Sequence, residues 1–291
     1  MSNLASQFIA ENKAKHAQGL DARALDLSNC GLVDLPIELE ELIWLEHLIL
    51  NENPVLNNLI FISNLSQLRV LHFSDTGVTD LMPIKKLIKL EEIVFSKTGV
   101  SDITPLLGLQ QLTFLSFYST PVEDLSPISG LLLLNFLDCS DTKIRDLSNF
   151  TGLSNLETLY CKHTRVADLA PLANFKKLKE LNCGHTFVSD LSPLVKLKSL
   201  KRLHCEATLI SDLTPLSKLK NIEFFSCADT NVANLLPIKH WIERFWQQVR
   251  YETNEGQIRV GGCPLVYPPI SIVKSGNQVI LQYFDDWSTH N

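Results

Sequence analysis

The 291-residue sequence lacks a basic N-terminal leader, a long apolar run and any excess of positive charge. It has 26 basic residues against 32 acidic ones, which gives a formal net charge of −6. Such a balance offers no general attraction to phosphate backbones or to anionic lipid surfaces. Because no apolar stretch reaches membrane-spanning length, the sequence predicts a cytoplasmic protein with neither a nucleic-acid nor a membrane partner.

Recognisable catalytic and disulfide signatures are also missing. The sequence has no G-x-x-x-x-G-K-[ST] phosphate loop, no G-x-S-x-G elbow and no H-E-x-x-H metal motif. Its seven cysteines are odd in number and are not clustered as in a small disulfide scaffold, which favours a reducing compartment. We therefore expect a protein that is not an enzyme and has no cofactor.

The sequence does contain an internal repeat with a period of 22 residues. Within one unit, apolar side chains alternate as in a short strand and are then spaced by three, as in a helical or 3₁₀ return. Proline at the start of several returns suits a first helical turn, and a preceding Ser or Thr can cap it. The period is marked by threonines at Thr76, Thr98, Thr120, Thr142, Thr164, Thr186, Thr208 and Thr230.

A single repeat cannot be stable alone. Seven buried side chains contribute about 1.5 to 3 kcal/mol each, whereas ordering 22 backbone positions costs about 1 to 2 kcal/mol each. Successive units must therefore stack and share their apolar faces, and the two ends of the stack need caps.

The unit LxxLxLxxTxVxDLxPLxxLxx resembles the 22-residue class of bacterial leucine-rich repeat found in internalins, with threonine in place of the commoner asparagine. Cys30, Asn53 and Cys263 occupy the threonine position in further units, so eleven rungs are expected. The resemblance implies an α/β repeat solenoid, a curved leucine-rich-repeat stack. Its parallel sheet would lie on the concave face, its helical or 3₁₀ returns on the convex face, and helical caps at both ends.

The two ends of the chain resemble the entry and exit of the repeat domain in Roco proteins, where that domain precedes a Ras-like GTPase. This chain has no phosphate loop, so GTP binding is not carried over. We expect an N-terminal helical cap over residues 1–22, leucine-rich repeats over 23–236, and a helical insertion, last strand and capping helix over 237–291.

Three elements of the end regions are predicted in detail. Leu4, Phe8 and Ile9 should cover the first coil. The spacing of apolar residues from Ile238 to Val249 predicts one amphipathic helix that seals the last repeats or docks a partner. The segment 271–287 should form a single capping helix after the Pro268-Pro269 pair.

Two stretches, "LYCKHT" and "LNCGHT", place a cysteine two residues before a histidine and raise the question of a metal site. Strand alternation turns the cysteine inward, and neither ligand pattern matches a known zinc spacing, so we interpret the cysteines as core. The aspartates that follow each threonine by four residues should cap the returning backbone rather than bind calcium. The cysteine column comprises Cys139, Cys161, Cys183, Cys205 and Cys227.

Functional residues are expected on the exposed strand face, because that face alone varies between repeats. Exposed aromatic side chains beside polar groups are typical of protein-binding hot spots. Phe114 and Phe136 should be neighbours with Tyr118 and Tyr160 close by, and Glu180 and Glu206 would contribute to a charged flank. The predicted partner-binding residues are Phe114, Phe136, Tyr118, Tyr160, Lys162, His163, Asn182, His185, Arg202 and His204.

These patterns predict a non-catalytic scaffold that binds a protein on its concave face. Two alternatives stay open, namely a regulatory recognition module of a Roco-like GTPase system and a secreted bacterial effector that binds a host protein. We expect a monomer, with a homodimer as the alternative. A metal or pH-sensing role for His163, His185 and His204 is the less favoured interpretation, because no carboxylate or thiolate pair accompanies them.

Overall fold

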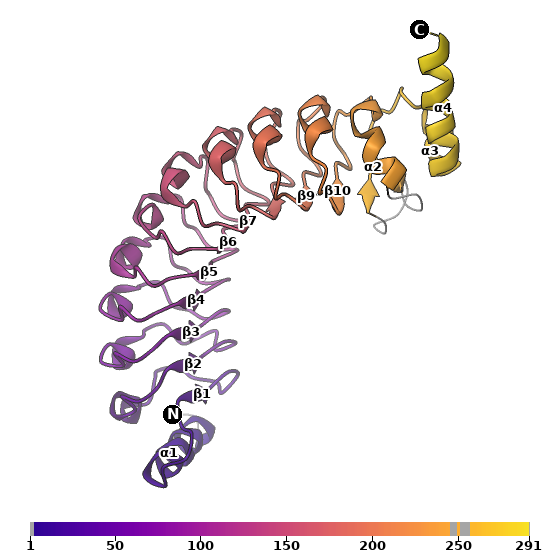
Figure 1. The fold of residues 1–291 in the computed structure, drawn as a ribbon. Coiled ribbons are helices and arrows are strands. Elements are labelled where there is room, and N and C mark those ends of the chain that lie inside the picture. The colour runs from indigo at the N-terminus through magenta and orange to yellow at the C-terminus, as the bar shows by residue number, and fades with distance from the viewer. Residues whose placement is uncertain (1–2, 245–248, 251–256, 291) are drawn as a thin grey trace. The chain divides into compact units, whose positions relative to one another are not determined.

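A computed structural model describes residues 3–244, 249–250 and 257–290 of the chain (Figure 1). The chain forms two compact units, residues 1–144 (unit 1) and 145–291 (unit 2). Each unit is a stack of coils in which a three-residue strand, a tight corner and a 3₁₀ turn follow one another. The strands lie on one side of each stack and the 3₁₀ turns on the opposite side, as expected for a leucine-rich-repeat solenoid.

Unit 1 begins with helix α1 (Asn3–Ala17) and continues with six parallel strands in chain order. Each strand residue pairs with the equivalent residue one repeat later, for example Glu92 with Phe114 and Phe114 with Phe136. The strands are β1 (Ala24–Asp26), β2 (His47–Ile49), β3 (Val70–His72), β4 (Glu92–Val94), β5 (Phe114–Ser116) and β6 (Phe136–Asp138). The 3₁₀ turns are η1 (Ile37–Glu41), η2 (Ile60–Ile62), η3 (Met82–Ile84), η4 (Thr104–Gly108) and η5 (Ser126–Ile128).

Unit 2 continues the same pattern, and its strands are hydrogen-bonded in the order β7-β8-β9-β10-β12-β11. The strands are β7 (Thr158–Tyr160), β8 (Glu180–Asn182), β9 (Arg202–His204), β10 (Phe224–Ser226), β11 (Val249–Arg250) and β12 (Ile258–Arg259). The 3₁₀ turns are η6 (Ser148–Gly152), η7 (Ala170–Asn174), η8 (Ser192–Lys196), η9 (Thr214–Lys218) and η10 (Leu236–Ile238). The helices are α2 (Lys239–Arg244), α3 (Ile270–Lys274) and α4 (Asn277–His290).

The core of each unit is built from columns of identical or similar side chains. The leucine at the centre of each strand is fully buried, as Leu115 and Leu203 illustrate. In unit 1, Phe73, Phe95 and Phe117 stack in succession with ring centroids 5.6 and 5.5 Å apart. The five cysteines of the cysteine column are fully buried free thiols, which confirms the core interpretation.

The threonine column closes each corner from inside. Thr142, for example, is 7% exposed, and its hydroxyl donates to the carbonyl of Cys139 at 2.7 Å. Asn53 does more, because its side chain accepts from the Leu32 amide and donates to the carbonyl of Leu50. Threonine satisfies the carbonyl only, and the longer asparagine amide also ties the neighbouring coil.

The aspartate column caps the 3₁₀ turns, as predicted. In every case the carboxylate Oδ1 accepts a hydrogen bond from the amide two residues later, at 2.6 to 2.8 Å. Ser126 does not cap the turn, because its hydroxyl donates back to Asp124. The aspartates are Asp80, Asp102, Asp124, Asp146, Asp168, Asp190 and Asp212.

An asparagine closes the sheet edge at the first strand. Asn12 of α1 is 4% exposed, and its amide donates to the carbonyls of Ala22 and Ala24, both at 3.0 Å. Trp44 in turn donates its indole N–H to Asn12. The prediction that Leu4 covers the first coil is wrong, because Leu4 is 45% exposed and the buried positions of this helix include Ala5 and Ile9.

The C-terminal region departs from two predictions. The expected helix from Ile238 to Val249 is shorter, because α2 ends at Arg244 and Val249 belongs to strand β11, which adds a rung beyond the eleven expected. Of the apolar residues that carried that prediction, Phe245 and Trp246 lie outside the described residues. The expected single capping helix is two helices, α3 and α4, separated at Gly276 with φ +97°.

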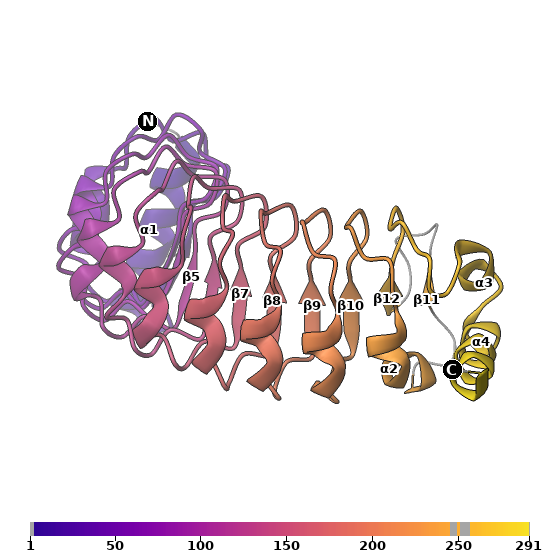
Figure 2. The same ribbon diagram turned by 90° about the horizontal axis from the view of Figure 1, so that it is seen from above.

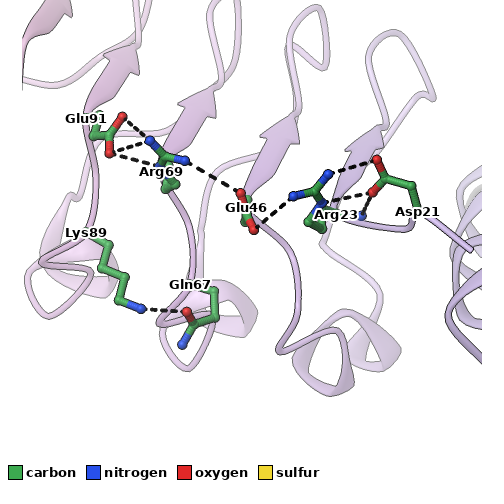
Figure 3. Close-up of polar contacts among 7 residues, drawn as sticks. All are labelled: Asp21, Arg23, Glu46, Gln67, Arg69, Lys89 and Glu91. Atoms are coloured by element: carbon green, nitrogen blue, oxygen red, sulfur yellow. Dashed lines mark hydrogen bonds and ion pairs between the residues drawn. The ribbon is translucent and has the colours of Figure 1, made fainter. Parts of the chain in front are cut away.

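Charged side chains line the edge that leads into the strands of unit 1. Arg23 pairs with Asp21 and lies 3.8 Å from Glu46, and Arg69 lies between Glu46 and Glu91 (Figure 3). These contacts are exposed and alternate in sign from coil to coil, so they favour the register of the stack and contribute little stability each.

Candidate functional site

An aromatic pair marks the strand face of unit 1. Phe114 and Phe136 occupy equivalent positions on the paired strands β5 and β6, so the register of the sheet brings their rings together. The rings stack with centroids 4.0 Å apart and planes 2° from parallel. Both side chains are half-buried. The predicted proximity of these two phenylalanines is confirmed, and they offer one apolar surface with a free face.

Polar groups accompany this pair along the same strands. Asp138 follows Phe136 by two residues, and burial raises the pKa of its carboxyl. The carboxylate accepts a hydrogen bond from the Ser140 amide at 3.0 Å. Tyr118, two residues before its threonine, lies below the Lys97 ammonium, which is 6.0 Å from the ring centroid. Unit 1 thus places an acceptor and a cation within one repeat of its aromatic pair.

In unit 2 the predicted residues converge on Glu180. The Tyr160 hydroxyl donates to Glu180 Oε1 at 3.0 Å, across the pair of strands β7 and β8. Arg202 Nε lies 3.3 Å from the same oxygen, and His204 Nε2 lies 3.8 Å from it. Three of the predicted residues therefore share one carboxylate, which holds their side chains in fixed positions.

Phe224 is an exception to the expected exposure of this face, because it is only 7% exposed. The guanidinium groups of Arg202 and Arg259 lie 4.9 and 4.8 Å from its ring centroid, and His204 stacks on it at 4.4 Å. The expectation that Phe224 faces solvent is therefore wrong. It supports the cationic side chains that cover it, through cation–π contact.

Glu206 is the most unusual group on this face. Its Oε2 atom is buried and has no hydrogen-bond partner among the described residues. The carboxylate lies across Gly184 on the neighbouring strand, where a Cβ atom would come within 2.9 Å of it. Burial lowers the pKa of the adjacent His204 imidazole, while the Glu206 charge acts in the opposite direction. A neutral imidazole therefore leaves the Glu206 carboxylate uncompensated at neutral pH.

The remaining predicted residues lie at the corners of the coils. His163 and His185 are exposed, have φ of 54° and stack with ring centroids 4.1 Å apart. Lys162 is half-buried, and Asn182 accepts a hydrogen bond from the Gly184 amide at 3.1 Å. Within the described part of the chain, no group of three or more His, Cys, Asp or Glu side chains could hold a metal ion.

Sequence reasoning missed two contributors to this surface. Arg259 was not predicted because it comes from β12, which pairs with β10 only after a 33-residue repeat. The buried Glu206 oxygen was not predicted because it depends on the missing side chain of Gly184 in the next coil. The period of 22 placed both Gly184 and Glu206 in one column, so this signal was available.

The arrangement on both units is suited to binding. It offers aromatic faces, fixed charges and amide groups, each held by neighbours in adjacent coils, which lowers the entropy lost when a partner binds. Among the described residues, no helix has the length and apolar character needed to cross a bilayer.

Comparisons with known proteins agree with the fold. Residues 133–174, 154–196 and 176–218 match the family model described as Leucine Rich repeats (2 copies), so the chain contains leucine-rich repeats. A search of curated proteins gives no match. An internalin, InlF from Listeria monocytogenes, is 22% identical with a TM-score of 0.72, over 88% of this chain and 78% of its own.

Two further solved structures share the fold. The functional domain of InlJ from Listeria monocytogenes, which includes a cysteine ladder, is 19% identical with a TM-score of 0.61, over 72% of this chain and 49% of its own. The plant peptide hormone receptor RGFR1 in complex with RGF2 is 18% identical with a TM-score of 0.65, over 76% of this chain and 38% of its own. At these identities the likeness establishes the fold alone.

Proposed function

We propose that this chain is a non-catalytic scaffold that binds a protein partner through the strand face of its repeats. The observation that carries the proposal is the stacked pair of Phe114 and Phe136. Two half-buried aromatic rings on adjacent strands bury a large apolar area when covered and lose little side-chain entropy, as in binding hot spots. A scaffold has no need of such a pair at this position.

The second part of the proposed interface is the cluster around Glu180 in unit 2. Arg202 and His204 contribute cationic and aromatic surface, and Tyr160 contributes an aromatic face. These side chains are already ordered by contacts within the protein, so a partner pays less to fix them. The other residues proposed to contact the partner are Tyr118, Lys162, His163, Asn182 and His185.

A comparison of partner capture by two variants tests this function. Phe114→Ala/Phe136→Ala should reduce recovery of the partner at least tenfold relative to the unmodified protein, because truncating a hot-spot residue costs about 2 kcal/mol or more. The matched control is Ile60→Ala/Met82→Ala, which removes two exposed apolar side chains from the 3₁₀ side of the same unit. Recovery at equal strength by all three proteins would exclude the aromatic pair as the interface.

Finer assignments belong to the same proposal. The spacing of 22 residues supports placing the repeats in the 22-residue class, and the end segments support a regulatory role beside a Roco-like GTPase as an alternative. The similarity to internalins supports the other alternative, an effector that binds a host protein. We retain a cytoplasmic location and a monomeric state as part of the proposal for the scaffold role.

A further inference from the structure

A dense basic surface lies on the return segments of unit 2, away from the strand face. Residues 170–179, 192–202 and 214–222, which form three successive returns, contain nine lysines and arginines and no acidic residue. Six of the lysines are exposed and define what we name the lysine surface. They are Lys176, Lys177, Lys196, Lys198, Lys218 and Lys220.

The repeat places these lysines in rows. Lys176, Lys198 and Lys220 are 22 residues apart and follow the turns η7, η8 and η9, whereas Lys196 and Lys218 end the turns η8 and η9. The 3₁₀ turns of unit 2 lie side by side (Figure 2). Hydrogen bonds confirm that consecutive returns are in register.

These bonds join the side chains of one return to the previous one. Lys177 Nζ donates to Asn155 Oδ1 at 2.7 Å, and Asn221 Nδ2 donates to the Lys198 carbonyl at 2.8 Å. Lysines 22 residues apart therefore start from neighbouring backbone positions and form a fixed array of positive charge.

Intramolecular ion pairs do not neutralise this array. Within the described part of the chain, none of the six amino groups lies within 4.0 Å of a carboxylate. The neighbouring lysines Lys179 and Lys201 do form such pairs, with Glu157 and Glu223. Unit 1 shows the same compensation along its edge, where Arg69 lies between two glutamates. The lysine surface thus departs from the charge balance of the other repeats.

We propose that the lysine surface binds an extended acidic segment of a partner protein. Same-side residues of an extended chain recur about every 6.8 Å, and each row provides one lysine per coil. The long, flexible lysine side chains can adjust to the remaining difference in spacing. An acidic segment that alternates carboxylates with small residues would therefore meet one row with successive side chains. This surface is separate from the strand face and does not depend on the function proposed above.

The chemistry of the surface favours a protein over the other polyanions. Nucleic-acid surfaces add arginine forks for phosphate or aromatic rings for stacking, whereas these six positions are all lysine. Stable attachment to a bilayer requires a second signal beside a polybasic patch. The exposed large apolar side chains of unit 2, among them Phe187 and Leu209, lie outside the three returns.

Binding of a defined acidic peptide tests the proposal. A fluorescein-labelled 12-residue peptide of alternating Glu and Ser is titrated with the full chain in 0.15 M salt, and anisotropy is measured. Lys176→Glu/Lys198→Glu/Lys220→Glu should weaken binding by about 10- to 100-fold, because three exposed attractions become repulsions. The matched control, Lys85→Glu/Lys86→Glu/Lys89→Glu in unit 1, makes the same change in net charge and should stay within about twofold.

Several outcomes would overturn the assignment. One is no binding of the peptide to the unmodified protein, and another is equal binding by the two triple variants, provided that both melt like the unmodified protein. Tighter binding to phosphatidylserine vesicles or to duplex RNA, lost in the unit 2 variant, would identify a lipid or nucleic-acid surface instead. Self-association in sedimentation that the same variant abolishes would identify a second copy as the occupant.

Discussion

Cysteine thiols in the buried column differ in acidity from the thiol at its end. Burial is the main cause that raises the pKa of Cys139, Cys183 and Cys205 above the ordinary value. At the end of the column, a hydrogen bond with the Cys227 thiol lowers the pKa of Cys263 to about 7. A thiolate is the reactive form, so the same column contains inert thiols and one more acidic group.

These differences predict the reaction of the native protein with dithiodipyridine at pH 8. In Cys30→Ser/Cys263→Ser, the remaining five thiols should react at least 100-fold more slowly in the native protein than in urea, followed by absorbance. Cys30 and Cys263 are the thiols that react first in the unmodified protein. Rapid reaction of all five column thiols in the folded variant would contradict their burial.

His204 predicts how stability depends on pH. Burial under the strand face lowers its pKa, although the nearby Glu206 favours the charged form. In the unfolded chain a histidine titrates near pH 6.5. Between that pH and the lower native pKa, the unfolded state binds the proton first, so stability is full above about pH 6.5 and falls as the pH decreases through this window.

The measurement is the difference in free energy of unfolding between the unmodified protein and His204→Gln, from pH 8 to pH 5. The unmodified protein should lose stability relative to the variant as the pH falls below about 6.5. A control with His185→Gln, an exposed position, should leave the pH profile unchanged. A parallel profile for all three proteins would show that His204 titrates normally in the fold.

Residues in the periodic columns could be predicted from sequence because their contacts repeat with the same period. The aspartate caps and buried cysteines needed only the position within one coil. Phe224 could not be placed in this way, since Arg259 covers it from a strand that arrives after an insertion of irregular length. Of the candidate site, the aromatic pair was predicted, and the group that shares Glu180 was predicted only as a set of exposed residues.

Elements were predictable where the sequence period held and less so where it stopped. Ile238, Trp241 and Ile242 follow a helical spacing and are buried in η10 and α2. Val249 continues that spacing by coincidence, but it forms the edge strand β11, where its amide donates to Asn277. An apolar residue at the right interval therefore does not distinguish a longer helix from a short strand that covers the same core.

Helix α1 predicts the consequence of losing an end cap. Asn12 satisfies two carbonyls at the first strand and accepts from Trp44. Asn12→Ala should lower the free energy of unfolding by about 2 to 3 kcal/mol, because buried polar groups lose their partners. Gln7→Ala is the matched control, since that exposed amide contacts Glu11 within the same helix, and it should change stability by less than about 0.5 kcal/mol.

Urea unfolding followed by circular dichroism measures both variants. An Asn12→Ala protein as stable as the Gln7→Ala protein would show that the helix covers the first coil by apolar contact alone. Such a result would also remove the reason for burying an asparagine in a face otherwise formed by side chains such as Ala5 and Ile9.

At the scale of the whole chain, charge is divided unequally between the two units. Unit 1 has 9 basic and 18 acidic residues and unit 2 has 17 and 14, which gives net charges of −9 and +3. The total of −6 therefore conceals a basic half, and the expectation that this chain attracts no polyanion followed from the average. The units also differ in what they present, with stacked phenylalanines on one and lysine rows on the other.

This division predicts that the two proposed surfaces act independently. Phe114→Ala/Phe136→Ala should leave affinity for the Glu-Ser peptide within about twofold, since the altered side chains lie in unit 1 and carry no charge. Conversely, the lysine variant should still recover the strand-face partner, since residues more than about 10 Å apart without shared contacts behave additively. Combining both sets in one protein and measuring both activities completes the cycle. If either set of substitutions reduced both activities tenfold in a protein that melts normally, one ligand would span the two surfaces.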